Sequence, residues 1–275
     1  MRGWVLLHVA AMEWRVAGRA RWTGLFAVAF GGLSLAVSYF GMIHAGFSGF
    51  VGFTRTAMSL VSLVTLLLPL LGLGVGAVAF GADRESQQLF VAQPLGRAEL
   101  VVGRYLGLLA ALTTAALLGF GSAGVVVALR AGSGGWVRYV GLTGLSTLLL
   151  AQCLGLGSWI GTASRDRGRA VGAAVAVWGG LVILYDLVAM GLTVALGGEA
   201  ARPVLVSMVL ANPVDLVRVL ALLLVGARES LGAPGAALVS AMHGLGGTVL
   251  LPIAAAAWLV LPVAWACRQA QQQDF

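Results

Sequence analysis

Residues 56–82 read TAMSLVSLVTLLLPLLGLGVGAVAFGA, a stretch without a charged side chain. A helix needs about 20 apolar residues to cross the hydrocarbon core of a membrane, so this stretch is long enough to do so. The chain contains five more stretches of this kind, and none shows the strict alternation of a barrel strand. The predicted spans are Trp22–Met42, Thr56–Ala82, Tyr105–Leu129, Tyr139–Ala163, Ala170–Leu196 and Gly244–Cys267. We therefore expect an all-α membrane protein with six transmembrane helices.

The composition supports the same class. Hydrophobic residues make up 60% of the 275 residues, charged residues make up 10%, and the mean hydropathy is +0.97. A water-soluble domain cannot bury so much apolar surface. The longest stretch outside the predicted spans, residues 197–243, is itself largely apolar. We expect residues 1–275 to form a single membrane domain.

The basic residues predict the orientation of the chain. All 17 are arginine, and there is no lysine. With a cytoplasmic N-terminus, the inner segments hold eleven arginines and the outer segments hold the other six, as the positive-inside rule requires. We expect a multi-pass protein of the inner (cytoplasmic) membrane with both termini in the cytoplasm. Its net charge of +7 would then face anionic membrane lipids and not nucleic acid.

The first 21 residues read as a helix that lies in the inner membrane interface. Trp4, Trp14 and Trp22 would sit at the depth of the headgroups, with the arginines turned to water. A signal peptide would have a shorter charged region and a shorter apolar region.

Residues 82–104 are the charged segment between the second and third spans. Pro94 ends any preceding helix, Gly96 permits a turn, and the following residues can restart a helix that presents Arg97 and Glu99 to the cytoplasm. Such a helix could transmit force from a soluble partner. An ordinary solvated loop, whose charges only fix the topology, explains the same residues equally well.

Residues 197–243 form the predicted extracytoplasmic segment. Asn212 and Pro213 have the pattern of a helix N-cap followed by the first helical residue, and Asp215 and Arg218 stand one turn apart. We expect a short helix that lies on or dips into the outer leaflet.

Asp186 is the one acidic residue deep inside a predicted span. A carboxylate there costs on the order of 3 kcal/mol on insertion scales, so it should face a partner or a watery path. It is a candidate for the translocation path. A structural hydrogen bond to a Thr or Tyr of another helix is the alternative, and is favoured slightly.

Met42, His44, Met242 and His243 lie near the outer face in this topology. Thioether and imidazole ligands suit Cu(I), which makes these four residues a candidate metal site. Unligated residues at the interface are the simpler explanation, because the spacing of a tight metal site is missing.

Two other readings of function are disfavoured. Ser48 lies in a Gly-x-Ser-Gly pattern like that of intramembrane proteases, but it falls in the first outer loop without a placed base. A secondary transporter is also disfavoured, since we find no inverted repeat and only one intramembrane charge. A nucleotide-binding P-loop needs a lysine, so an ATPase acting here, with its ATP and Mg²⁺, must be a separate subunit. We expect no enzyme activity and no cofactor in this chain.

Two motifs identify a family that the chain resembles. Glu13, Arg19, Arg21 and Trp22 stand at the foot of the first span, and Pro94-Leu95-Gly96-Arg97 precedes the third. The chain resembles the permeases of ABC-2 type ABC transporters, and within them it is most similar to the permease of the nitrous oxide reductase maturation system. The second similarity is carried by Leu68-Pro69-Leu70, Pro94-Leu95-Gly96-Arg97 and Tyr185-Asp186-Leu187.

The resemblance implies partners and site residues. It implies a homodimer, two copies of a cytoplasmic ATP-binding subunit, and a periplasmic accessory protein that contacts Asn212, Asp215 and Arg218. The cargo would be a sulfur species or copper, or the permease would do mechanical work on its partner. The alternative is a general ABC-2 exporter of a hydrophobic compound or lipid-linked glycan. The residues that would couple to the ATPase are Glu13, Arg19, Asp83, Glu85, Arg97 and Glu99.

Overall fold

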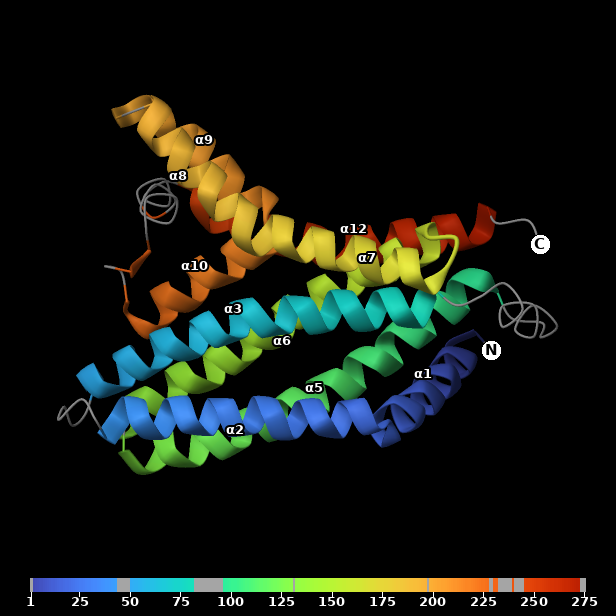
Figure 1. Cartoon of the computed structure of the whole chain (residues 1–275), viewed down its shortest axis with the longest axis horizontal. Helices are drawn as coiled ribbons and strands as arrows, with labels where there is room; N and C mark the ends of the chain where they lie inside the picture. Colours follow the sequence, from blue (N-terminus) through green and yellow to red (C-terminus); the bar gives the residue numbers. More distant parts are fainter. Residues whose placement is uncertain are drawn as a thin grey trace.

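The computed structural model describes residues 2–43, 50–81, 96–130, 132–196, 198–227, 230–231, 239 and 245–272. The elements within these ranges are helices (Figure 1). They are α1 (Arg2–Arg19), α2 (Arg21–Ile43), α3 (Phe50–Phe80), α5 (Arg97–Arg130), α6 (Gly132–Ala163), α7 (Arg167–Gly179), the π-helix η1 (Gly180–Leu184), α8 (Tyr185–Leu196), α9 (Gly198–Ala211), α10 (Pro213–Val225) and α12 (Leu245–Gln272). The predicted all-α fold is confirmed.

Within the described ranges, six helical regions are long and apolar enough to cross a membrane, which confirms the predicted number of spans. They are Thr23–Gly41, Thr54–Phe80, Arg97–Val125, Gly135–Ala163, Arg167–Leu196 and Val249–Gln272. The fifth span combines α7, η1 and α8.

The third span begins earlier than predicted. Residues 97–104, expected to belong to a separate coupling segment, form the first turns of α5, since no proline follows Pro94 to interrupt the helix there. The rest of the predicted coupling segment, residues 82–95, lies outside the described residues.

The helices α3 and α6 form the closest pair in the bundle. A Cβ atom added to Gly76 of α3 would lie 2.7 Å from both the Leu154 carbonyl oxygen and the Ser158 nitrogen of α6. A Cβ atom on Gly72 would lie 2.9 Å from the Leu154 nitrogen. Such glycines let two backbones approach where lipid provides no hydrophobic driving force between helices. These glycines therefore pack helices within one chain.

The helix α1 is separate from α2, as predicted, and packs on α5. Glu13 Oε1 lies 2.8 Å from Arg104 Nε, and a Cβ atom on Gly107 would meet the Ala10 carbonyl and the Glu13 side chain. The helix α1 begins where α12 ends, at one end of the bundle, which we call the terminal end (Figure 1). We call the opposite end the far end. An even number of spans places both termini at the same end.

The fifth span is the least covered. In an 18-residue apolar segment of this span only 6% of the residues are buried within the chain, compared with 61% in the corresponding segment of the fourth span. The helices α8 and α9 leave the bundle toward the far end, whereas α10 turns back against α3 and α6 (Figure 1). Most of the apolar surface of the fifth span must therefore meet lipid or another chain.

The close contact of α3 and α6 predicts the effect of a methyl group. Gly76→Ala should lower the free energy of unfolding by about 1–3 kcal/mol, because the new Cβ atom meets backbone that cannot move aside. Gly74→Ala is the matched control, since a Cβ atom there has nothing within 4 Å. Thermal unfolding in mild detergent measures both variants, and equal stability of the two would contradict the packing described.

Candidate functional site

The most polar part of the described membrane region is a bend between α9 and α10. The two helices meet at 105°, with Asn212 between them in an extended conformation (φ −122°, ψ 115°). A residue before proline is pushed out of the helical region, so Pro213 explains why α9 stops at Ala211. The Asn212 side chain accepts a hydrogen bond from the Val214 N–H at 2.9 Å and caps α10, as predicted. We call the α9–Asn212–α10 unit the elbow.

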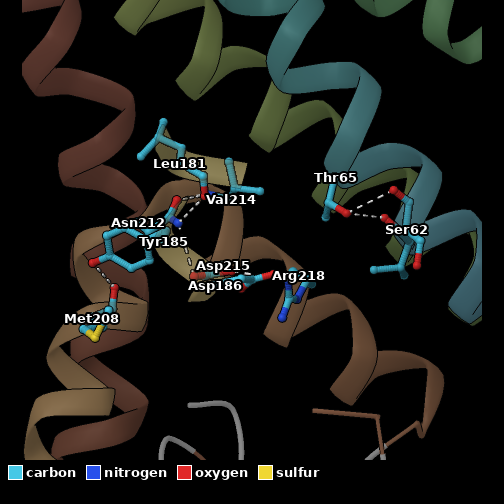
Figure 2. Close-up of polar contacts among 11 residues, drawn as sticks. Ser62, Thr65, Leu181, Tyr185, Asp186, Met208, Asn212, Val214, Asp215 and Arg218 are labelled. Atoms are coloured by element: carbon cyan, nitrogen blue, oxygen red, sulfur yellow. Dashed lines mark hydrogen bonds and ion pairs between the residues drawn. The ribbon is translucent and has the colours of Figure 1, made fainter. Parts of the chain in front are cut away.

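Side chains from the fifth and sixth spans donate hydrogen bonds to backbone carbonyls at the end of α9. The Tyr185 hydroxyl donates to the Met208 carbonyl at 2.9 Å, and Trp258 Nε1 of α12 donates to the Leu210 carbonyl at 3.0 Å (Figure 2 shows the first bond). The last carbonyls of a helix have no partner within that helix, and an unpaired carbonyl away from water is costly. These two bonds attach the elbow to both neighbouring spans.

Three charged side chains join the elbow to α8. Arg218 Nη1 lies 2.8 Å from Asp186 Oδ2 and 3.6 Å from Asp215 Oδ1 (Figure 2). The Asp215 side chain is only 10% exposed, whereas those of Arg218 and Asp186 are 32% and 45% exposed. Asn212 Nδ2 completes the set with a 3.2 Å bond to Asp215 Oδ2. We call Tyr185, Asp186, Asn212, Asp215 and Arg218 the elbow cluster.

A π-helical turn in the fifth span directly precedes the side chains that contact the elbow. The five residues Gly180–Leu184 interrupt the α-helical hydrogen bonding immediately before Tyr185 and Asp186. The Leu181 carbonyl in this turn accepts a 2.9 Å hydrogen bond from Asn212 Nδ2. Short π-helical turns shift the register of the next helical turns and are frequent at functional sites. Here the turn precedes the two α8 side chains that bind the elbow.

The structure corrects one expectation about these residues. The partner of Asp186 is Arg218 and not a Thr or Tyr, because the elbow brings an arginine back to the middle of the fifth span. Asn212 and Asp215 are both buried within the chain, where Asn212 binds Asp215 and Asp215 pairs with Arg218. Contact of Asn212, Asp215 and Arg218 with an accessory protein stays a prediction.

The predicted coupling residues lie at the terminal end, as far as they are described. Arg97 donates to the Ala270 and Gln271 carbonyls of α12, at 3.3 Å and 3.5 Å. Glu13 faces Arg104, and Arg19 is the exposed last residue of α1. Glu99 lies in the first turn of α5. Asp83 and Glu85 lie outside the described residues.

The candidate copper ligands lie almost wholly outside the described residues. This holds for His44, Met242 and His243, and Met42 is described only as part of α2. Within the part of the chain that is described, no three His, Cys, Asp or Glu side chains gather as metal ligands.

Sequence reasoning missed the role of Tyr185 and Trp258 as donors to the elbow. Nothing in the sequence indicates that Trp258 points to another helix rather than to the membrane interface. The Asp186–Arg218 pair had a signal, because the two residues carry opposite charges and each lies in a long, largely apolar stretch.

Similarity to known proteins covers nearly the whole chain. Residues 7–267 match the family described as ABC-2 family transporter protein. The chain is 31% identical over 227 residues to the Probable ABC transporter permease protein NosY of Pseudomonas aeruginosa, covering 78% of this chain and 81% of that protein. It is 29% identical over 268 residues to the protein of the same name from Stutzerimonas stutzeri, covering 94% of this chain and 92% of that protein.

The elbow cluster predicts energetic coupling between α8 and α10. Asp186→Asn and Arg218→Gln should each lower the free energy of unfolding by about 1–3 kcal/mol, because each removes the 2.8 Å ion pair between these partly buried side chains. The double variant should lose less than the sum of the two, with a coupling of about 1–2 kcal/mol.

A matched pair controls for loss of charge alone. Asp166 and Arg169 also form an ion pair, but their side chains are 49% and 70% exposed, so Asp166→Asn and Arg169→Gln should couple by less than about 0.5 kcal/mol. Chemical unfolding in detergent measures both cycles. Additive effects at the elbow would show that the Asp186–Arg218 contact does not hold it.

Proposed function

This chain belongs to the ABC-2 family of transporter proteins as a membrane permease, and from that premise we propose that its elbow is the outer gate of an ATP-driven transporter. The observation that carries the proposal is the elbow cluster, which together with Trp258 joins a re-entrant helix pair to the fifth and sixth spans. ABC permeases work with an ATP-binding subunit. In the proposed complex, two copies of this chain pair and bind two copies of that subunit.

The ATP-binding subunit would bind the permease and act on it at the terminal end. The arginine asymmetry of the sequence supports a cytoplasmic location for this end in the inner membrane. Arg97 at the start of α5 binds carbonyls at the end of α12, and the Glu13–Arg104 pair binds α1 to α5. A push on any of these three helices would therefore move the others.

The helix α12 would carry the movement to the gate. It runs from the Arg97 contacts at the terminal end to Trp258, whose indole N–H binds the end of α9. The charged pair of Arg218 and Asp186 then transmits movement of the elbow to α8. This route connects the two ends of one chain through contacts between neighbouring helices.

The largely uncovered fifth span supports the homodimer. Its apolar surface is available either to lipid or to a second copy, and a permease of this family needs a path between two such surfaces. A dimer formed there would place the two elbows close to the shared path.

We assign the chain to maturation of nitrous oxide reductase. Its sequence resemblance to the permease of that maturation system supports this assignment. The cargo would be a sulfur species or copper, or the elbow would do mechanical work on a periplasmic accessory protein. If copper is carried, Met42, His44, Met242 and His243 are the candidate ligands. A general ABC-2 exporter of a hydrophobic compound or lipid-linked glycan would share the same architecture and is the alternative.

The coupling proposal predicts effects on assembly of the complex and on the regulation of its ATP hydrolysis. The chain should copurify with its ATP-binding subunit, and ATP hydrolysis should be regulated within the complex. Arg97→Ala combined with Glu99→Ala should leave the permease inserted but detach the ATPase or remove that regulation. Arg55→Ala, at the exposed start of α3 at the far end, is the control. Unchanged association and regulated hydrolysis in the double variant would remove these residues from the coupling route.

The maturation assignment predicts a phenotype. Deleting the gene in a host that makes nitrous oxide reductase should leave a reductase with low activity and an incomplete metal centre. The wild-type chain should restore both, and the Arg97→Ala, Glu99→Ala variant should not. A fully active reductase in the deletion strain would favour the general exporter.

A further inference from the structure

A cavity at the terminal end is separate from the elbow. It has a volume of about 460 Å³ and lies between the last turns of α6 and α12. Its lining residues are Trp159, Trp265, Arg268, Gln269 and Gln272. The last four come from the final two turns of α12, and Trp159 stands one turn before the end of α6.

Two tryptophans form the apolar wall. The ring centres of Trp159 and Trp265 are 5.3 Å apart, and the rings are tilted by 43°. Trp265 remains 43% exposed although it is among the largest apolar side chains. Tryptophan favours the depth of lipid headgroups, where its ring contacts acyl chains and glycerol while its N–H meets polar groups. The wall therefore belongs at the boundary between acyl chains and headgroups.

The polar side of the cavity suits an anion. Arg268 is exposed and has no ion pair within the described residues, and none of the five lining residues is acidic. Its guanidinium and the two glutamine amides present N–H donors to the same space, and a planar guanidinium binds phosphate oxygens in pairs. Arg97 binds the carbonyls of Ala270 and Gln271, which offsets the partial negative charge at the end of α12.

We propose that this cavity binds the headgroup of an anionic phospholipid, with its phosphate on Arg268 and its glycerol region against the two indoles. One exposed arginine binds a free phosphate only weakly, because water and salt screen the charge. A lipid adds apolar contact with Trp159 and Trp265 and is already concentrated in the membrane. The two parts of the cavity together therefore fit a lipid and not a soluble anion.

The experiment measures lipid binding by native mass spectrometry of the intact complex released from nanodiscs. The probes are phosphatidylglycerol, phosphatidylcholine and inorganic phosphate. We expect retention of phosphatidylglycerol by the wild type, with Arg268→Gln and Trp265→Leu each weakening it roughly fivefold or more. Arg165→Gln is the matched control, because it removes the same charge from an exposed position at the same end, outside the cavity. It should bind like the wild type.

Each outcome decides the proposal. Arg268→Lys keeps the charge and should retain part of the binding, which separates a lost contact from a lost fold. Equal weakening by Arg268→Gln and Arg165→Gln would show general attraction to a charged surface and overturn the site. Phosphatidylcholine retained as well as phosphatidylglycerol, or inorganic phosphate that displaces the lipid at equal concentration, would overturn the anionic-lipid assignment.

Discussion

In the hydrocarbon core, every broken backbone bond and every charge must find its partner inside the protein, and the elbow satisfies this requirement. The chain turns by 105° at Asn212, which leaves carbonyls at the end of α9 and N–H groups at the start of α10 without helical partners. Tyr185, Trp258 and the Asn212 side chain supply those partners. Arg218 enters with the returning helix and is neutralised by Asp186. The bend and the charges therefore depend on one another.

The sequence predicts the parts of this arrangement that are local. Long apolar stretches predict the spans because their length alone decides whether a helix can cross, and Asn212-Pro213 predicts a helix start because capping involves adjacent residues. The pairing of Asp186 with Arg218 joins residues 32 positions apart, and it requires the re-entrant path of α9 and the π-helical turn before Tyr185. Neither feature has a local pattern. The same limit explains why the sequence favours an outer surface for Asn212 and Asp215, since it shows their polarity but not their burial.

The two ends of the molecule differ in the kind of contact that holds them. At the terminal end, Arg97 and the Glu13–Arg104 pair join three helices, α1, α5 and α12, that come from distant parts of the chain. The tight packing of α3 on α6 gives the bundle a stiff centre, because Gly76 leaves no space for adjustment between the backbones. The elbow, in contrast, is joined to α8 and α12 by directional polar contacts, and the fifth span that contains α8 is sparsely covered. A rigid centre with a polar, re-entrant far end suits a permease in which ATP-driven movement is expressed outside the packed core.

The proposed gate requires that α8 and α9 move as one unit against the stiff bundle. Distances between spin labels test this central claim, in the complex with the ATP-binding subunit and with Cys153 and Cys267 replaced. Labels at Met190 and Ser207 report α8 against α9, and labels at Ser59 and Ser207 report α3 against α9; all three positions are exposed. On adding a non-hydrolysable ATP analogue, we predict that the α3–α9 distance changes and the α8–α9 distance does not. A changed α8–α9 distance with a fixed α3–α9 distance would contradict the proposed gate.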